Sequence, residues 1–168
     1  MRHTLSVLVD DKPGVLARVA SLCSRRGFNI HSLAVGPVAE PGRSRITLVV
    51  DGDQMEQVSK QLHKLVNVIK VTEYGGDDAV EREVMLIRVS ADSERRREVL
   101  DAAAAFKAEP VDIAVSSVAF EVVGHPRKLA AFLEVIRPFG VVDMVKSGRI
   151  ALARDGNGRP QKDTRRSR

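Results

Sequence analysis

The sequence has few of the residues that mark disulfide-bonded, metal-binding or base-stacking proteins. One of its 168 residues is cysteine, Cys23, and none is tryptophan. A single cysteine excludes a disulfide framework and any Cys-x-x-Cys metal or redox motif, and it fits a reduced, cytoplasmic setting. Aromatic residues make up only 4% of the chain, which leaves little for a surface that stacks nucleic-acid bases.

Long apolar runs and enzyme signatures are also missing. No run approaches the roughly 20 apolar residues of a membrane span, and no signal peptide precedes the first predicted strand. The glycine-rich dinucleotide motif, the phosphate-binding loop and the nucleophile elbow are absent. The four histidines are scattered without the i, i+4 spacing of a metal site on a helix. We therefore expect no catalytic residues and no metal site in this chain.

The formal charge of +5 is concentrated at the C-terminus. Residues from Arg159 onward include five Arg or Lys and one Asp, so they carry +4 and leave the rest of the chain nearly neutral. A neutral body is a poor electrostatic partner for nucleic acid. Residues 156–168 lack apolar periodicity, and we predict that they form a disordered basic tail.

Hydrophobic periodicity in the first half predicts the order β-α-β-β-α-β, the split βαβ arrangement. Alternating apolar residues predict strands over 3–10, 28–35, 44–50 and 68–74, with the second and third forming a hairpin. Helical spacing predicts one helix over 14–26. A second helix opens at Asp51-Gly52-Asp53 and carries apolar residues as far as Val66.

The same order repeats after a linker at Gly75-Gly76-Asp77-Asp78. Strands are predicted over 83–90, 111–116 and 118–124, with a further strand region over 141–154 that is broken at Ser147-Gly148. Helices are predicted from a cap at Asp92-Ser93 to residue 107, and over 126–137. The predicted domains are 1–76 and 77–155, followed by the tail. Domains of about 75 residues bury only around 60% of their chain surface, so we expect a twofold copy to cover an edge or a face.

The stretch Asp11-Lys12-Pro13-Gly14-Val15-Leu16 is the most informative part of the chain. Pro13 suits a first helical position, and Gly14 leaves the first amides of the helix uncovered at the positive end of its dipole. With Asn29 one helix further on, we expect a cluster that holds the ammonium and the carboxylate of a free amino acid. A helix cap after a tight turn, without any ligand, fits the same pattern.

The order β-α-β-β-α-β is shared with a common RNA-recognition module, which stacks bases on aromatic residues of its central strands. Here the first strand offers Leu5 and Val7, and the third, residues 45–50, has no aromatic residue either. The sequence therefore argues against RNA binding.

Residues 3–74 resemble an ACT domain, a small ligand-sensing module, with Asp11 to Leu16 as its ligand-loop signature. From about residue 2 to 155 the chain is similar to the small, regulatory subunits of acetohydroxyacid synthase (acetolactate synthase), and residues 3–36 and 60–71 carry the most specific part of the likeness. The resemblance implies an α+β fold of two ferredoxin-like βαββαβ domains, the first an ACT domain.

The resemblance also implies partners and a role. Such subunits form homodimers that dock onto a large catalytic subunit, which uses thiamine diphosphate, magnesium and FAD to join pyruvate to pyruvate or 2-oxobutyrate. They raise its activity and confer feedback inhibition by valine, bound where two ACT domains meet, in branched-chain amino acid biosynthesis. No cofactor is then expected in this chain.

The effector-binding positions that the resemblance implies are Asp11, Gly14, Val15, Leu16, Asn29 and Ile30. Relatives often carry an amide at position 11 and Glu at position 31, where this chain has Asp11 and His31. These departures bear on the choice among valine, leucine and isoleucine.

The second domain has no Pro-Gly in its corresponding turn, residues 90–93, and we expect it to contact the catalytic subunit. Two alternatives stay open. One is a free-standing ACT amino-acid sensor that acts on another partner, and the other is an enzyme of its own, which no residue pattern supports.

Overall fold

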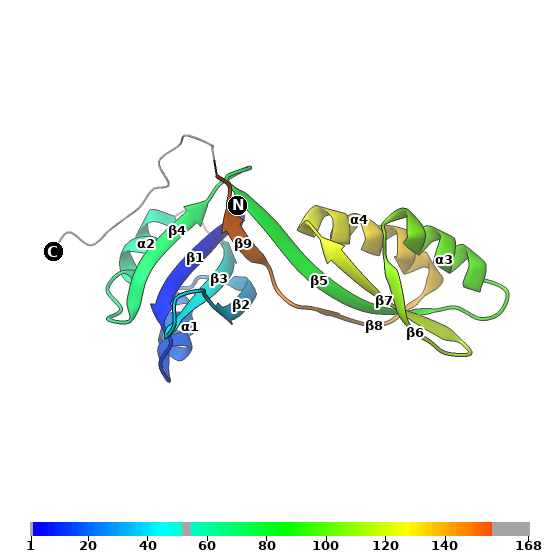
Figure 1. The fold of residues 1–168 in the computed structure, drawn as a ribbon, viewed down its shortest axis with the longest axis horizontal. Coiled ribbons are helices and arrows are strands. Elements are labelled where there is room, and N and C mark those ends of the chain that lie inside the picture. The colour runs from blue at the N-terminus through cyan, green and yellow to red at the C-terminus, as the bar shows by residue number, and fades with distance from the viewer. Residues whose placement is uncertain (1, 52–54, 156–168) are drawn as a thin grey trace. The chain divides into compact units, whose positions relative to one another are not determined.

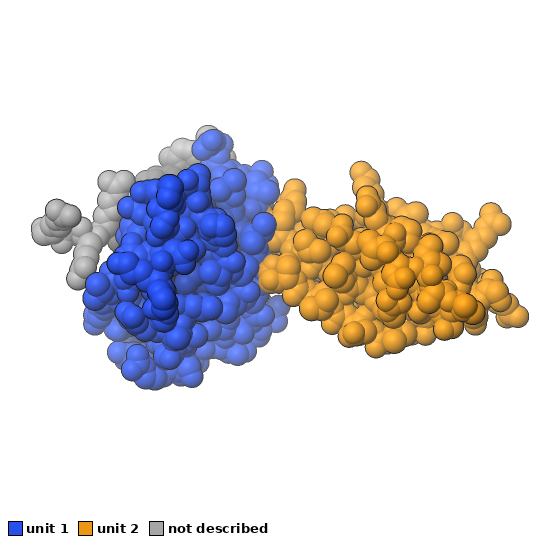
Figure 2. All heavy atoms as spheres, turned by 60° about the horizontal axis from the view of Figure 1, so that its bottom comes forward, with its two compact units in different colours: residues 1–80, 149–168 blue, residues 81–148 orange. Residues whose placement is uncertain are grey.

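The structure, a computed structural model, describes residues 2–51 and 55–155 (Figure 1). The predicted tail, residues 156–168, and the predicted start of the second helix at Gly52 and Asp53 lie outside the described residues. The chain forms two compact units, residues 1–80 with 149–168 and residues 81–148 (Figure 2). The division at residue 76 stays a prediction. The structure adds that residues 149–155 group with the first unit.

The first unit contains one antiparallel sheet with strand order β2-β3-β1-β4. Its elements follow each other as β1 (Arg2–Asp10), α1 (Val15–Arg25), β2 (Ile30–Pro37), β3 (Arg43–Asp51), α2 (Met55–Leu62) and β4 (Val68–Tyr74). The predicted hairpin of the second and third strands is confirmed, with Leu33 paired to Leu48 and Val35 to Ile46.

The core of this unit lies between one face of the sheet and the two helices. Alternation along β1 sends Leu5, Val7 and Val9 to that face, where each is at most 2% exposed. The other members of this core cluster come from both helices and from β3 and β4: Val15, Val19, Leu22, Ile46, Leu48, Val50, Val58, Leu62, Val68 and Val71. Both helices therefore cover the same face.

Two helix ends predicted for this unit are wrong. The helix α1 begins at Val15, so Pro13 lies in the preceding turn, because Gly14 adopts a left-handed conformation (φ 81°) that helical residues do not share. The helix α2 ends at Leu62 and not at Val66. The amides of Lys64 and Leu65 bond three residues back, in turns that lead to β4, and Val66 is 84% exposed.

The second unit repeats the arrangement, with strand order β6-β7-β5-β8. Its elements are β5 (Ala79–Ser90), α3 (Arg96–Ala105), β6 (Glu109–Ile113), β7 (Ser117–Gly124), α4 (Pro126–Ile136), a 3-10 turn (Arg137–Phe139) and β8 (Val141–Lys146). The first two residues of β5 group with the first unit. Phe132 of α4 centres the core, with edge-to-face contacts to Phe106 and Phe120 at 5.5 and 6.5 Å between ring centroids.

The predicted break in the last strand region is confirmed, whereas the predicted bounds of α3 are wrong, because this helix begins at Arg96 and not at Asp92-Ser93, and ends at Ala105 and not at residue 107. Asp92 Oδ1 accepts the amides of Glu94 and Arg95 at 3.2 and 2.9 Å just before α3. The chain breaks after β8 and resumes as β9 (Ile150–Ala153). The element order and both sheet topologies confirm the α+β class with two ferredoxin-like βαββαβ domains.

Candidate functional site

The turn between β1 and α1 is built around Gly14. Its φ of 81° bends the chain so that the helix starts one residue later, and a Cβ at this position would stand 3.7 Å from Nη2 of Arg18. No side chain caps the helix start. The positive end of the dipole of α1 therefore faces outward at Gly14, next to the exposed side chain of Asp11.

The first amides of this turn are only partly available. The Val15 amide donates to the carbonyl of Lys12 at 3.4 Å, which is a long bond, and the Asp11 amide donates to Gly42 O at 2.9 Å. The Val15 side chain is 5% exposed and belongs to the core, whereas Leu16 is 40% exposed. Of the two, only Leu16 offers side-chain surface to a ligand.

A polar chain that the sequence analysis missed surrounds the helix start. Arg18 Nη1 donates to Asn67 Oδ1 at 2.9 Å, and Asn67 Nδ2 donates to Asp10 Oδ2 at 3.4 Å. Lys12 Nζ lies 3.9 Å from the same Asp10 oxygen. Arg18 stands one helical turn after Gly14, and this i, i+4 spacing was the signal that could have found it.

The other predicted site residues lie at the start of β2, in a second polar cluster. The Asn29 carbonyl accepts the Asp51 amide at 3.2 Å, and Asn29 Nδ2 lies 3.4 Å from His31 Nε2. His31 Nε2 is also hydrogen-bonded to Asp51 Oδ2, and this bond holds the pKa of Asp51 below its usual value. Arg2 Nε, 3.8 Å from Asp51 Oδ1, adds a smaller effect in the same direction.

The expectation that Asp11, Gly14 and Asn29 lie close together is wrong within one chain. Asp10 pairs with Arg43 at one end of β1 and β3, whereas Arg2 pairs with Asp51, beside Asn29, at the other. With about 3.4 Å per residue, the nine residues of β1 place the two groups on the order of 30 Å apart. The predicted site is therefore divided between opposite ends of one sheet.

The strand that runs between these two ends, β2, is an edge of the sheet. Leu33 and Val35 point to the helix-covered face, opposite the core residues Leu48 and Ile46, yet they are 36% and 48% exposed. They form an apolar strip along β2 that the described residues leave partly exposed.

The chain matches two family models. One, described as an AHAS small subunit-like ACT domain, matches residues 5–70, and the other, described as the small subunit of acetolactate synthase, matches residues 82–155. The acetolactate synthase small subunit of Mycolicibacterium smegmatis is 49% identical over 93% of each chain. A probable acetolactate synthase small subunit of Archaeoglobus fulgidus is 47% identical over 92% of this chain and 98% of its own. The chain belongs to the acetolactate synthase small subunit family.

A solved structure of this family agrees with the fold. The acetolactate synthase small subunit of Thermotoga maritima superposes with a TM-score of 0.84 at 37% identity, covering 92% of this chain and 98% of its own. The family, the fold class and the ACT nature of the first domain are thereby confirmed. So is the coarse role of a small, regulatory subunit of acetolactate synthase. None of the described helices is long and apolar enough to cross a membrane.

Proposed function

We propose that this chain activates the large, thiamine-dependent catalytic subunit of acetolactate synthase and makes it sensitive to valine. The observation that carries the sensing part is the division of the predicted site along β2, an edge strand with an exposed apolar strip. One chain offers two half-sites, and two chains related by a twofold axis offer two whole ones.

The geometry of an edge strand supports this arrangement. Two β2 strands that pair antiparallel about a twofold axis bring Ile30 of one copy next to the Pro37 end of the other. Pro37 pairs with Ser44, and Ser44 with Val9, so this is the end at which Asp11 and Gly14 lie. Such pairing would satisfy the open backbone groups of β2 and cover Leu33 and Val35.

The chemistry of the two half-sites suits a free amino acid. The helix start at Gly14, with the Arg18 guanidinium beside it, would hold the carboxylate. Asp11 of the same copy, or Asn29 of the other, would accept from the ammonium. A branched side chain would lie near Leu16 and the half-buried Ile30, where its burial contributes roughly 1.5–3 kcal/mol. Valine and leucine differ there by only about 1–3 kcal/mol.

Thiamine diphosphate, magnesium and FAD would then bind to the large subunit. Among the described residues of this chain, no three His, Cys, Asp or Glu side chains gather in a way that suits a metal ion. This chain would bind the large subunit and change its activity. By linkage, valine can change that activity only if it binds the complex with a different affinity in the active and the inhibited states.

The test is acetolactate formation against valine concentration for the large subunit reconstituted with wild-type chain, Gly14→Asp or Asn29→Ala. A carboxylate at Gly14, about 4 Å from that of valine, costs about 4 kcal/mol at an effective dielectric near 20, on the order of a thousandfold in affinity. Asn29→Ala removes a hydrogen bond to a charged group, a loss of roughly 1.5–3 kcal/mol. We expect normal activation, with Gly14→Asp more resistant to valine than Asn29→Ala.

Gly76→Asp is the matched control, because Gly76 is also left-handed (φ 52°), with open space around its Cβ position, and it lies outside both half-sites. It should keep full sensitivity to valine. Unchanged inhibition of the Gly14→Asp complex would remove the helix start from the effector site. Failure of the wild-type chain to bind and activate a large subunit would favour the free-standing sensor.

A further inference from the structure

The face of the first sheet that points away from α1 and α2 carries small side chains at its centre, and we call this recessed area the floor. Strand pairing places its residues in rows across the four strands. The middle row consists of small side chains, namely Ala34, Thr47, Ser6 and Thr72, and the next row consists of Gly36, Arg45, Leu8 and Lys70. The long side chains of Arg45 and Leu8 therefore stand beside a low floor of hydroxyl groups.

The strand β9 is anchored to this face of the sheet at its Arg149 end. The Arg149 amide donates to Ser32 Oγ at 2.7 Å, and Arg149 Nη1 donates to Thr4 Oγ1 at 3.0 Å. Beyond the strand, the Arg154 amide donates to Asp78 O at 2.9 Å. Ala151 is buried, whereas Ile150 and Leu152 keep 60% and 64% of their surface exposed.

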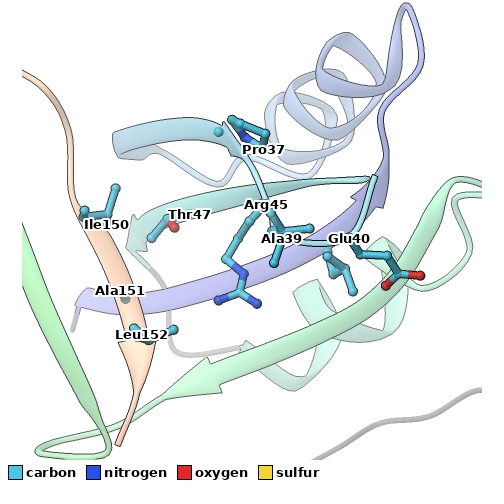
Figure 3. A pocket seen from close by; sticks show the side chains of 11 residues that line it. Pro37, Ala39, Glu40, Arg45, Thr47, Ile150, Ala151 and Leu152 are labelled. Atoms are coloured by element: carbon cyan, nitrogen blue, oxygen red, sulfur yellow. The ribbon is translucent and has the colours of Figure 1, made fainter. Parts of the chain in front are cut away.

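A pocket of about 540 Å³ remains between β9, the floor and the segment after β2. Leu8, Thr47, Ile150 and Leu152 are among the residues that line it. Figure 3 shows the Arg45 side chain extending from β3 into the space between β9 and the segment that carries Ala39 and Glu40. The pocket thus combines the cationic side chain of Arg45 with apolar walls.

Arg45 has unused binding capacity in this pocket. Its Nε is buried and has no hydrogen-bond partner among the described residues, a state that costs free energy until an acceptor arrives. Its neighbour across the strands, Gly36, leaves the adjoining space open, since a Cβ there would meet nothing within 4 Å. The other charged side chain in the lining, Glu40, is paired with Arg43.

We propose that this pocket binds a small organic monocarboxylate, with its carboxylate on Arg45 and a short apolar chain against Leu8, Ile150 and Leu152. A planar guanidinium matches a carboxylate in two parallel hydrogen bonds, and Thr47 at the floor supplies a hydroxyl. The apolar walls favour a carboxylate with a hydrocarbon body over inorganic phosphate, which needs several donors and gains nothing from them. The site lies on the opposite face of the sheet from the helix start at Gly14 and does not depend on it.

Methyl NMR of the full-length chain with 3-methylbutanoate as the probe tests this site. We expect saturable shifts of the Ile150 and Leu152 methyl groups, and weak ones with the neutral isostere 3-methylbutanamide or with phosphate. Arg45→Gln should weaken binding at least tenfold, or about 1.4 kcal/mol. Lys70→Gln removes a charge from the same row outside the pocket lining and should leave the affinity unchanged.

Gly36→Leu provides a second variant that keeps Arg45. Gly36 has no left-handed φ, so a side chain is tolerated there and should fill the pocket and abolish the shifts. The same shifts in the Gly14→Asp chain would separate this site from the proposed effector site. Equal shifts with the amide or with phosphate would overturn the carboxylate assignment. Binding that survives both Arg45→Gln and Gly36→Leu would overturn the site itself.

Discussion

Asp51 ends β3 with its carboxylate between His31 of the neighbouring β2 and Arg2 of β1. The hydrogen bond from His31 is the main reason why the pKa of Asp51 is lower in the folded chain than its usual value. A carboxyl group of this kind favours folding while it is ionised. Its contribution is present above the usual aspartate pKa of about 3.9 and is lost as the pH falls through the lower, folded value.

Asp51→Asn should therefore be less stable than the wild type at pH 6, and the difference should shrink as the pH falls below the usual aspartate value. Because the carboxylate is exposed to solvent, we expect a small effect that salt weakens further. Urea unfolding at pH 6, 4 and 2 measures the free-energy difference. In a His31→Gln background the pH dependence of that difference should shrink. A difference that stays constant across this range would show that the His31 bond does not set it.

Cys23 lies on the core side of α1 and is 0% exposed. Burial raises the pKa of its thiol, so little thiolate forms at pH 8 and the sulfur is also out of reach. We expect iodoacetamide to leave native Cys23 unmodified and to label it fully in urea, as followed by mass spectrometry. Ser24→Cys in a Cys23→Ala background, one residue away on the exposed side of the helix, should react readily in the native state. Rapid labelling of native Cys23 would mean that α1 opens easily.

The elements with strong local periodicity were predictable, and their relative placement was not. Alternation in residues 3–10 and the apolar stripe of α1 identify a strand and a helix, since both patterns lie within a few neighbouring residues. The proximity of Asp11 and Asn29 was misjudged because α1 lies between them. Its 11 residues carry the chain about 16 Å back along the sheet. Arg18 and Asn67 were missed because their contact depends on where β4 joins the sheet.

The apolar strip on β2 is the feature of this element that the proposed dimer uses. Leu33→Lys puts a charge where two copies would bury leucine, and burial of one such side chain contributes about 1.5–3 kcal/mol. Because both copies carry the change, we expect the dimer dissociation constant to rise at least a hundredfold, and valine inhibition to be lost with it. Analytical ultracentrifugation measures the first effect and reconstituted activity the second.

Ile69→Lys is the matched control for the β2 edge. Ile69 is 38% exposed, close to the 36% of Leu33, but it lies on β4 at the opposite edge of the same sheet. This variant should dimerise normally. Equal weakening by both changes, or no weakening by Leu33→Lys, would place the contact between copies elsewhere.

At the scale of the whole molecule, we expect the isolated chain to make no acetolactate from pyruvate. The sequence contains no recognisable nucleophile, base and oxyanion constellation, and the family role is that of a small subunit. A colorimetric acetolactate assay with thiamine diphosphate, magnesium and FAD, on a preparation shown free of large subunit, checks this. Turnover by that preparation would make the chain an enzyme in its own right.

The path of the chain through its two units also has a consequence for stability. The chain leaves the first unit after Val80, forms the second, and returns to the first at Arg149. This return was not predictable, because four residues of β9 look like a continuation of the preceding strand. Its anchors on Ser32 and Thr4 lie more than one hundred residues earlier.

Two truncations test the return segment. Ending the chain after Gly148 removes the two Arg149 hydrogen bonds together with β9, whose Ala151 is buried. With about 0.5–1.5 kcal/mol for each neutral hydrogen bond and 1.5–3 kcal/mol for a charged one, we expect the free energy of unfolding of the first unit to fall by roughly 2–4 kcal/mol.

Ending the chain after Gly158 keeps β9 and should change neither stability nor activation of the large subunit. Urea unfolding followed by methyl signals of Leu5 and Leu48 reports on the first unit alone. If the shorter chain were as stable as the longer one, β9 would contribute nothing to the first unit, and the pocket over its floor would lose its wall.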